Sequence, residues 1–405
     1  RSIRPRLPAD RSIRLMTSLF DDLLTEEQIL FRDSVRGFAE RHLADGRLAR
    51  AHERSFPFDV ARLMAGQGLL GMTFPEADGG AGGSLMDAIL AIEAVAAVCP
   101  RSADVVQAGN FGPIRTFAEF ATPEQKGRWL GRLLRGEIAI SLGMSEPEAG
   151  SAATDLKTTA TPDGDGFRIN GTKVFASHSP DAELFLVYVR YGRGIDGIGS
   201  VLIERGTPGL TLGKPVRYVG GDDWCQLYFE DVRVPAENVL LREGGFKKQI
   251  AAFNVERLGN SARALAFGRH AFGIAREHAA TRVQFGRTLS EFQGIQWKFA
   301  EMAARMEAAQ LMLYRVAQRA SDRLPEAFDT ALVKYLCNEA GFFAANESMQ
   351  VLGALGYSEE SLVEYCWRRT RGWQIAGGSL EMMRNRIAEG VFGRSFSQRP
   401  PKPSA

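Results

Sequence analysis

The stretch Gly143–Ala160, GMSEPEAGSAATDLKTTA, concentrates side chains that could bind a polar ligand. Ser145, Ser151 and Thr154 offer hydroxyl groups, and Gly150 allows the backbone to approach a ligand closely. Such a lining suits a polar heterocycle or a phosphate group. Composition alone favours another interpretation, a linker between domains, because Ser, Gly and Ala are ordinary loop residues. The elements on either side of the stretch indicate whether it is a ligand-binding segment or a linker.

Helical patterns precede this stretch, from Thr25 to about Gly136. Thr25 and Glu27 mark the start of a helix. The segment that follows has an apolar stripe formed by Ile29, Phe31, Val35 and Phe38. The glycine-rich break Phe74–Ser84 lacks the strand and helix context of a phosphate-binding loop, so we interpret it as a tight connection between helices.

From about Glu137 to Asn238 the apolar period changes to two, which is typical of β-strands. Asn170-Gly171 lies between two β-rich runs and predicts a hairpin turn. Further short strands, separated by Gly and Pro, are expected at Leu184–Arg190, Ser200–Glu204, Leu210–Leu212 and Gln226–Val234. We therefore expect a compact β-domain, with Gly143–Ala160 at its junction with the preceding helices.

The remainder of the chain has the pattern of three long helices, for which a bundle is the natural packing. Ala and Gly dominate Ser261–Ala280, which allows a close approach between helices. An apolar stripe that we interpret as core is formed by Ile295, Phe299, Met302, Met306, Leu313 and Val316. The expected fold class is α+β multidomain, with a basic extension at 1–15, an N-terminal helical domain at 16–136, a middle β-domain at 137–243, a C-terminal helical bundle at 244–396 and a disordered tail at 397–405.

The composition argues against several classes of protein. Fifty Lys and Arg against 48 Asp and Glu give a formal charge of +2 without a long basic block, so nucleic acid is not an expected partner. The most apolar helical run, Ala88–Val98, contains Glu93 and is too short to cross a bilayer. Four scattered cysteines and five dispersed histidines predict neither a metal site nor a disulfide framework. We expect a reducing cytoplasm or organelle matrix, and select the cytoplasm.

Several segments resemble the FAD-dependent acyl-CoA dehydrogenase family. The order Met-Ser-Glu-Pro-x-Ala-Gly-Ser from Met144, followed by Leu-Lys-Thr-Thr-Ala, is similar to the family's first signature. Arg-Val-Gln-Phe-Gly from Arg282 is similar to a second motif, and matching segments run in the family's order from about Leu24 to Arg394. The resemblance implies a helical domain, a β-domain and a C-terminal four-helix bundle, with bound FAD and an acyl-CoA substrate.

The resemblance also implies a reaction. A base removes a proton from the carbon next to the thioester carbonyl, and hydride passes from the next carbon to flavin N5, which yields the α,β-enoyl-CoA. The protein must supply donors to the carbonyl, a carboxylate base and a dry pocket, which we expect where the β-domain meets the two helical layers. Electrons would pass to an electron-transfer flavoprotein, in fatty acid or amino acid catabolism.

The motifs imply positions for the FAD contacts. Ser145 matches the residue that bonds the flavin pyrimidine edge, and Ser151 matches the one near the diphosphate. Phe175 stands where many members have Trp against the flavin, and Ser177 stands where a hydroxyl reaches N5. The same segments give Met144 and Ser379 as further cofactor contacts.

A second set of contacts would serve the FAD of a neighbouring subunit. Arg282 and Phe285 match the residues that do so in the family. Gln293 follows at the family's spacing, and Gln350 and Gly353 match a segment at the adenosine end. If these residues reach a neighbour, the active unit is at least a dimer, and the family's usual homotetramer is expected.

Two departures from the family's motifs concern the chemistry. Ala152 replaces an Asp in the first signature, and Gly377 occupies the position of the catalytic Glu. Glycine cannot accept a proton, so another carboxylate must act or the reaction needs none. Members acting on isovaleryl-type substrates carry the base on the long helix that opens the C-terminal domain. Glu256 stands there and is the candidate base, with Asn254, Arg257 and Gly377 as candidate substrate contacts.

Alternatives remain open. Glu256 could be a solvated residue favoured by the helix dipole, and Glu381 is a weaker candidate base. The leading function is oxidation of a short, branched or unusual acyl-CoA. The runner-up is a non-oxidative enzyme similar to the 3-sulfinopropionyl-CoA desulfinase branch, which would need a guanidinium for the sulfinate, with Arg101 as a candidate. A third class is a non-catalytic or carrier-protein-directed relative.

Overall fold

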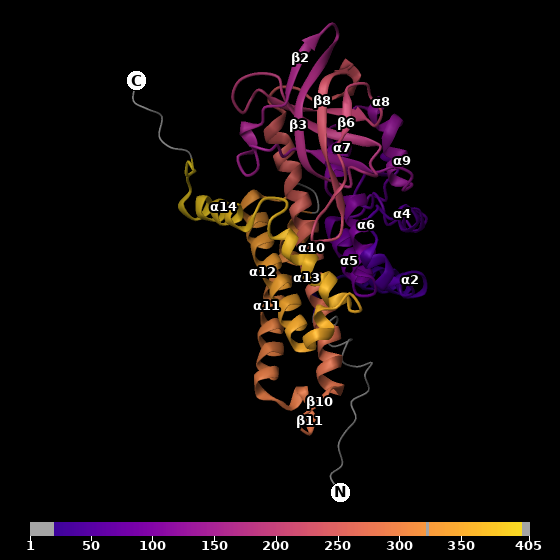
Figure 1. Cartoon of the computed structure of the whole chain (residues 1–405), viewed down its shortest axis with the longest axis vertical. Helices are drawn as coiled ribbons and strands as arrows, with labels where there is room; N and C mark the ends of the chain where they lie inside the picture. Colours follow the sequence, from indigo (N-terminus) through magenta and orange to yellow (C-terminus); the bar gives the residue numbers. More distant parts are fainter. Residues whose placement is uncertain (1–19, 321–323, 399–405) are drawn as a thin grey trace.

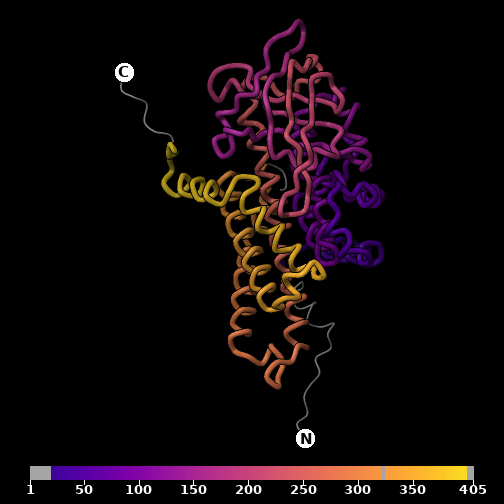
Figure 2. The backbone as a smooth tube through the Cα atoms, in the orientation of Figure 1, coloured from indigo at the N-terminus to yellow at the C-terminus, as the bar shows by residue number. Residues whose placement is uncertain are grey.

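The computed structural model describes residues 20–320 and 324–398. The expected extension at 1–15, and the tail from 399 onward, lie outside this part of the chain. Figures 1 and 2 show N-terminal helices, a β-region at one end of the molecule, and a long C-terminal bundle that extends away from the β-region. The α+β fold class expected from the sequence is confirmed, with helices, a sheet and helices in that order.

The N-terminal region is helical because capped, strongly apolar segments pack together. Its helices are α2 (Glu26–Leu43), α3 (Arg47–His52), α4 (Phe58–Ala65), α5 (Leu85–Ala96), α6 (Pro100–Asn110), α7 (Pro113–Phe120), α8 (Pro123–Gln125) and α9 (Gly131–Leu134). Thr25 caps α2, and its hydroxyl accepts a hydrogen bond from the Gln28 N–H at 3.2 Å. Helix α6 is buried along nearly its whole length, so its polar side chains must find partners inside the protein.

The β-region is a nine-stranded sheet. Its strands are β1 (Ile140–Gly143), β2 (Thr159–Asp163), β3 (Gly166–Ser177), β4 (Leu184–Arg190), β5 (Ile198–Glu204), β6 (Leu210–Leu212), β7 (Val216–Arg217), β8 (Asp223–Val234) and β9 (Val239–Leu241). The main path runs β6-β8-β3-β2-β4-β5-β9, while β1 pairs with β4 and β7 pairs with β8. Strands β1 and β2 run parallel to β4, and the other pairs are antiparallel.

The hairpin expected at Asn170-Gly171 is wrong. Both residues lie inside the continuous strand β3, at an irregularity in its pairing with β8. A Cβ atom on Gly171 would lie 2.5 Å from Thr158 Oγ1, so glycine serves a close approach of the chain rather than a turn. The β2–β3 hairpin instead turns between Asp163 and Gly166, where Gly164 has a φ of +63°.

The C-terminal region contains the bundle formed by α10 (Gly245–Thr281), α11 (Gln293–Arg319), α12 (Ala327–Leu352) and α13 (Leu362–Trp373). A short hairpin of β10 (Val283–Gln284) and β11 (Arg287–Thr288) lies at its far end, and α14 (Leu380–Phe392) projects to one side (Figure 1). The expected close packing occurs where α10 crosses α12. A Cβ atom on Gly341 would lie 2.1 Å from the Ala264 carbonyl oxygen, so the two backbones nearly touch.

One apolar core joins the N-terminal helices to the bundle. It includes Ile89 and Val95 from α5 and Leu265 and Phe267 from α10, all fully buried. The stripe predicted on α11 belongs to this core, with Met302, Met306, Leu313 and Val316 buried and Ile295 and Phe299 partly buried against it. In the described ranges, no helix is both long and apolar enough to cross a membrane.

Candidate active site

Glu256 lies on α10 with its side chain 16% exposed. The Gln107 side chain donates a hydrogen bond from Nε2 to Glu256 Oε2 at 2.5 Å, and the Gly112 backbone also bonds the carboxylate. The Arg263 guanidinium is 3.9 Å from Oε1, beyond hydrogen-bond distance. Burial raises the pKa of Glu256, and the attraction of Arg263 offsets only part of this rise. A carboxylate in this state is a better proton acceptor than a solvated one.

The loop after α13 is attached to α10 and α12 through two consecutive carbonyl groups. Lys334 donates from Nζ to the Ala376 carbonyl, and Arg257 donates from Nε to the Gly377 carbonyl at 3.1 Å. Gly377 and Gly378 have φ values of +73° and +90°, which favour glycine. Arg257 follows Glu256 directly on α10, and Lys334 also attracts the Glu256 carboxylate, so the loop and the candidate base share two cationic neighbours.

The cations that hold this loop are themselves buried. Burial lowers the pKa of Lys334 to about 7, and lowers the pKa of Arg257 to about 10. Among the described residues, no carboxylate lies within ion-pair distance of Lys334. The Arg257 guanidinium also donates to Asn254 Oδ1 at 2.8 Å, so Asn254 orients Arg257 from within the same helix.

On the β-domain, the ends of β1 and β3 bring four candidate cofactor contacts together. The Ser141 hydroxyl donates to the Ser177 carbonyl at 2.8 Å, and the Val174 N–H donates to the Ser145 carbonyl at 2.9 Å. Met144 directly precedes Ser145, and its carbonyl accepts a hydrogen bond from the Lys173 side chain. The resulting edge carries Ser145, Ser177 and the neighbouring aromatic side chains.

Phe175 is the most conspicuous aromatic residue at this edge. Its φ is +58°, and the residue is 58% exposed. Its ring lies 4.7 Å from that of Trp224 and 6.4 Å from that of Tyr218, and Tyr218 hydrogen-bonds Ser177. A left-handed, exposed phenylalanine supported by two other rings is a strained arrangement of the kind found at ligand sites.

The stretch from Gly143 to Ala160 is anchored to the sheet. Glu146 and Lys173, both buried, form an ion pair at 2.8 Å, and Glu146 also accepts from the Thr158 N–H at 2.9 Å. Ser151 is exposed on this anchored segment. A tethered segment of this kind does not behave as a free linker.

The second set of predicted contacts lies where α10 ends, where α11 begins and where α12 ends. Figure 1 shows the β10–β11 hairpin, which joins α10 to α11, at the end of the bundle away from the β-region. This set comprises Arg282, Phe285, Gln293, Gln350 and Gly353, all of which are exposed. An α-helix running from Glu256 to Arg282 spans about 39 Å. Within one chain, these five residues therefore do not lie near Glu256. Phe285 is 95% exposed with a φ of +51°, which is unusual for a large apolar residue.

Glu381 and Ser379 form a surface arrangement at the start of α14. The Glu381 side chain is 74% exposed and lies 3.2 Å from Arg384. Hydrogen bonds from its own backbone N–H and from the Ser379 hydroxyl lower the pKa of Glu381. A solvated carboxylate with a lowered pKa is a poorer base than Glu256.

The Arg101 side chain already has buried carboxylate partners. Its guanidinium is 2% exposed, lies 2.6 Å from Asp222 and 3.7 Å from Asp104, and donates to the Ser55 carbonyl at 3.1 Å. These partners belong to a buried charge network that sequence reasoning missed. Its other members are Arg263, Arg369 and Tyr365. No spacing in the sequence indicates the network, because its members come from four separate segments.

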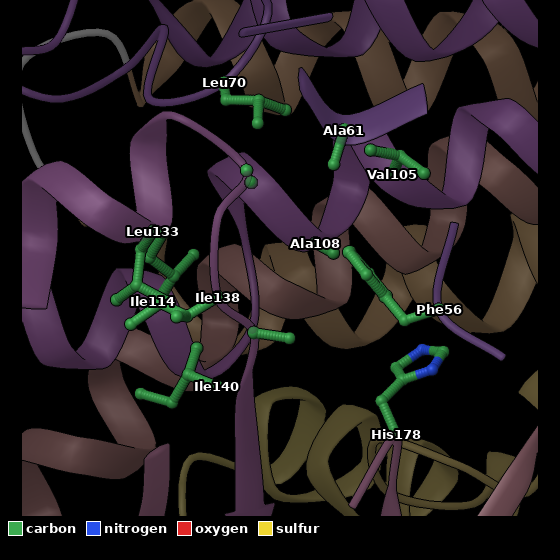
Figure 3. Close-up of a pocket in the computed structure, with 13 residues that line it drawn as sticks. Phe56, Ala61, Leu70, Val105, Ala108, Ile114, Leu133, Ile138, Ile140 and His178 are labelled. Carbon is green, nitrogen blue, oxygen red and sulfur yellow. The ribbon is translucent and has the colours of Figure 1, made fainter. Parts of the chain in front are cut away.

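Figure 3 shows the residues that line a small cavity between the N-terminal helices and β1. The volume of this cavity is about 40 Å³. Its lining is apolar apart from His178, which lies beside Phe56 with ring centroids 5.4 Å apart. The cavity has room for about one water molecule, whose share of liquid volume is roughly 30 Å³. It is too small for a nucleotide or an acyl thioester, and Glu256 is not among its lining residues.

Family models of the acyl-CoA dehydrogenase N-terminal, middle and C-terminal domains match residues 25–137, 141–232 and 243–392. An acyl-CoA dehydrogenase of Bacillus subtilis is 32% identical over 91% of this chain and 99% of its own length. A 3-sulfinopropanoyl-CoA desulfinase of Paraburkholderia xenovorans is 30% identical over 93% of this chain and 98% of its own. The structure of butyryl-CoA dehydrogenase from Megasphaera elsdenii superposes with a TM-score of 0.85 at 31% identity, covering 91% of this chain and 99% of that one. The chain therefore belongs to the acyl-CoA dehydrogenase family of FAD-dependent oxidoreductases.

Proposed function

We propose that this enzyme oxidises a short, branched or otherwise unusual acyl-CoA to the α,β-enoyl-CoA, with Glu256 as the base. The observation that carries the proposal is the geometry around Gly377. The loop has no carboxylate there, and Arg257, which bonds its carbonyl at 3.1 Å, is adjacent to a buried carboxylate. In this proposal the base comes from α10, and it acts on the substrate bound at the Gly377 loop.

The β-domain edge fits FAD. The hydroxyls of Ser145 and Ser177 offer polar partners for a heterocycle, and the exposed ring of Phe175 offers an apolar face for stacking. Bound there, FAD supplies the two-electron acceptor that the oxidation requires. Ser151 would contribute a hydroxyl near the diphosphate, while Met144 and Ser379 would complete the lining.

The loop at Gly377 is suited to bind the thioester carbonyl. Because Lys334 and Arg257 hold the carbonyls of Ala376 and Gly377, the loop backbone is fixed before the ligand arrives. The Gly377 N–H has no backbone acceptor among the described residues, so it is available to a substrate oxygen. A preorganised donor stabilises the negative charge that develops on that oxygen as the α-proton leaves.

Glu256 would take the α-proton onto its carboxylate. Burial has raised its pKa, which brings the base closer to the acidity of the proton it accepts. The carboxylate must be deprotonated at the start, so the rate should rise as pH increases through the pKa of Glu256. Asn254 supports this arrangement by orienting Arg257.

The far end of the bundle supports an oligomeric active unit. Arg282, Phe285 and Gln293 are exposed and lie at or beyond the C-terminal end of α10, about 39 Å along the helix from Glu256. We infer that they, with Gln350 and Gly353, contact FAD bound by a neighbouring copy in a homotetramer. An electron-transfer flavoprotein would then reoxidise the flavin.

The desulfinase alternative lacks a free guanidinium at its candidate position. Arg101 has Asp222 and Asp104 as partners, so a sulfinate would have to compete with two buried carboxylates. We therefore propose no second function.

The test is anaerobic mixing of the FAD-loaded enzyme with short, branched and sulfinated acyl-CoAs, followed by flavin absorbance and by sulfite release. Wild type should bleach with at least one saturated acyl-CoA, and Glu256→Gln should bleach about 10²- to 10⁴-fold more slowly. Glu381→Gln is the matched control and should behave as wild type. Equal bleaching in Glu256→Gln would remove Glu256 as the base, and sulfite release without bleaching would refute the oxidation.

A further inference from the structure

A buried network of charges connects the candidate base to three other parts of the molecule. Asp104 on α6 lies 2.9 Å from Arg263 on α10 and 2.8 Å from Arg369 on α13. Arg369 also pairs with Asp222, in the turn before β8, and Asp222 lies 2.6 Å from Arg101. All five side chains are 10% exposed or less. Such a network is strongly coupled because little water screens it.

The network has more positive than negative members. Arg101, Arg263 and Arg369 face only two carboxylates, those of Asp104 and Asp222. Glu256 is the additional carboxylate at the Arg263 end, at 3.9 Å. The Arg263 guanidinium therefore interacts more strongly with Asp104 than with Glu256. It contacts Asp104 at hydrogen-bond distance and Glu256 only at a longer range.

We propose that Asp104 is a positioning residue for the reaction, because it holds the Arg263 guanidinium away from a direct hydrogen bond with Glu256. This inference rests on the proposed function, in which Glu256 is the base. A charge-assisted bond from Arg263 would stabilise the ionised carboxylate and make it a weaker proton acceptor. Asp104 prevents that loss of basicity while keeping a compensating positive charge nearby.

Other charged and polar groups also face the two carboxylates. Glu256 is approached by Gln107 and by the backbone of Gly112 from the α6–α7 side, by Lys334 from α12 and by Arg257 on its own helix. Asp104 is approached by Arg369, Arg101 and the Tyr365 hydroxyl, the last at 3.1 Å, and by the like charge of Asp222. His178 lies near Asp222 rather than Glu256, and burial lowers its pKa. None of these groups is itself altered by a substitution at residue 104 or 263.

The experiment compares the pH dependence of the anaerobic flavin reduction rate among variants of the FAD-loaded enzyme. Asp104→Asn frees Arg263 for Glu256, so the midpoint of the acid limb should move to lower pH by about one unit, with a lower plateau rate. Arg263→Gln removes the positive charge, so the midpoint should move to higher pH by about the same amount. The double variant removes one charge of each sign and should return the midpoint toward the wild-type value.

Opposite shifts distinguish this role from simple support of the fold, since loosening the core would not move the midpoint in opposite directions. Asp222→Asn is the matched control, because Asp222 contacts Arg101 and Arg369 but not Arg263, and its midpoint should stay near that of wild type. If Asp104→Asn yields no FAD-loaded protein, a higher midpoint in Arg263→Gln than in the double variant supports the proposal, and equal midpoints overturn it.

The two proposals fail differently. Full activity in Glu256→Gln would refute Glu256 as the base and the inference with it. Loss of activity in Glu256→Gln, with midpoints unmoved or moved in the same direction in the other variants, would overturn the role of Asp104 alone.

Discussion

The crossing of α10 and α12 should tolerate no side chain at residue 341. In Gly341→Ala, the new Cβ would lie 2.1 Å from the Ala264 carbonyl oxygen, more than 1 Å short of an ordinary contact. The obstacle is backbone on a helix that is buried on both sides of the contact, so the helices themselves must separate. Helix α10 carries Glu256 and α12 carries Lys334, so separation would also disturb the active site.

The magnitude follows from two opposing terms. Forcing an extra methyl group into a well-packed core costs about 1–3 kcal/mol, and we expect the upper part of that range where backbone is the obstacle. Replacing a helical glycine by alanine returns about 0.5–1 kcal/mol through lower conformational entropy of the unfolded chain. We expect Gly341→Ala to lose about 1–2 kcal/mol of the free energy of unfolding, measured by urea unfolding followed by tryptophan fluorescence.

Gly273→Ala is the matched control. Gly273 lies on α10, and a Cβ atom there would meet nothing within 4 Å. Only the entropic term applies, so this variant should gain about 0.5–1 kcal/mol. Two variants of the same chemistry should thus change stability in opposite directions. A gain in both would refute the steric reasoning for Gly341, and a loss in both would refute the expected entropic gain at Gly273.

Two further predictions concern charge and assembly. Burial lowers the pKa of Lys334 from 10.5 to about 7, so the unfolded chain binds more protons than the folded chain between those pH values. The stability of wild type relative to Lys334→Met should therefore rise with pH across that window in urea unfolding, and a flat difference would contradict the burial of a neutralised amine. Phe285→Ala should weaken assembly and FAD retention, measured by light scattering with flavin absorbance, whereas an unchanged mass and occupancy would speak against its contact with a neighbour.

Local patterns in the sequence were sufficient for much of the fold. The short apolar run Leu184–Arg190 predicted β4 with its observed bounds, because a strand buried on both faces is a continuous apolar run of neighbouring residues. The same reasoning failed at Asn170-Gly171, where the approach of Thr158 determines the use of glycine. The observed β2–β3 loop is Gly164-Asp165, and a Gly-Asp pair is itself typical of two-residue hairpin loops.

Some residues of the candidate site could be predicted from the sequence, and others could not. Glu256 was selected because Gly377 cannot act as a base, and the structure shows it buried, although its catalytic role stays a prediction. Lys334, Asp104 and Arg263 were not selected, since each is an ordinary residue within its own helix. Their importance arises only from packing between α6, α10 and α12, which no local pattern encodes.

The buried charge network has a consequence for how the protein unfolds. Asp104 belongs to the N-terminal helices, Asp222 to the β-region, and Arg263 and Arg369 to the bundle. If any one region detached, at least one of these buried ion pairs would break. The three regions that family models recognise separately are thus bound into a single cooperative unit, in which partial opening costs more than separate domains would require.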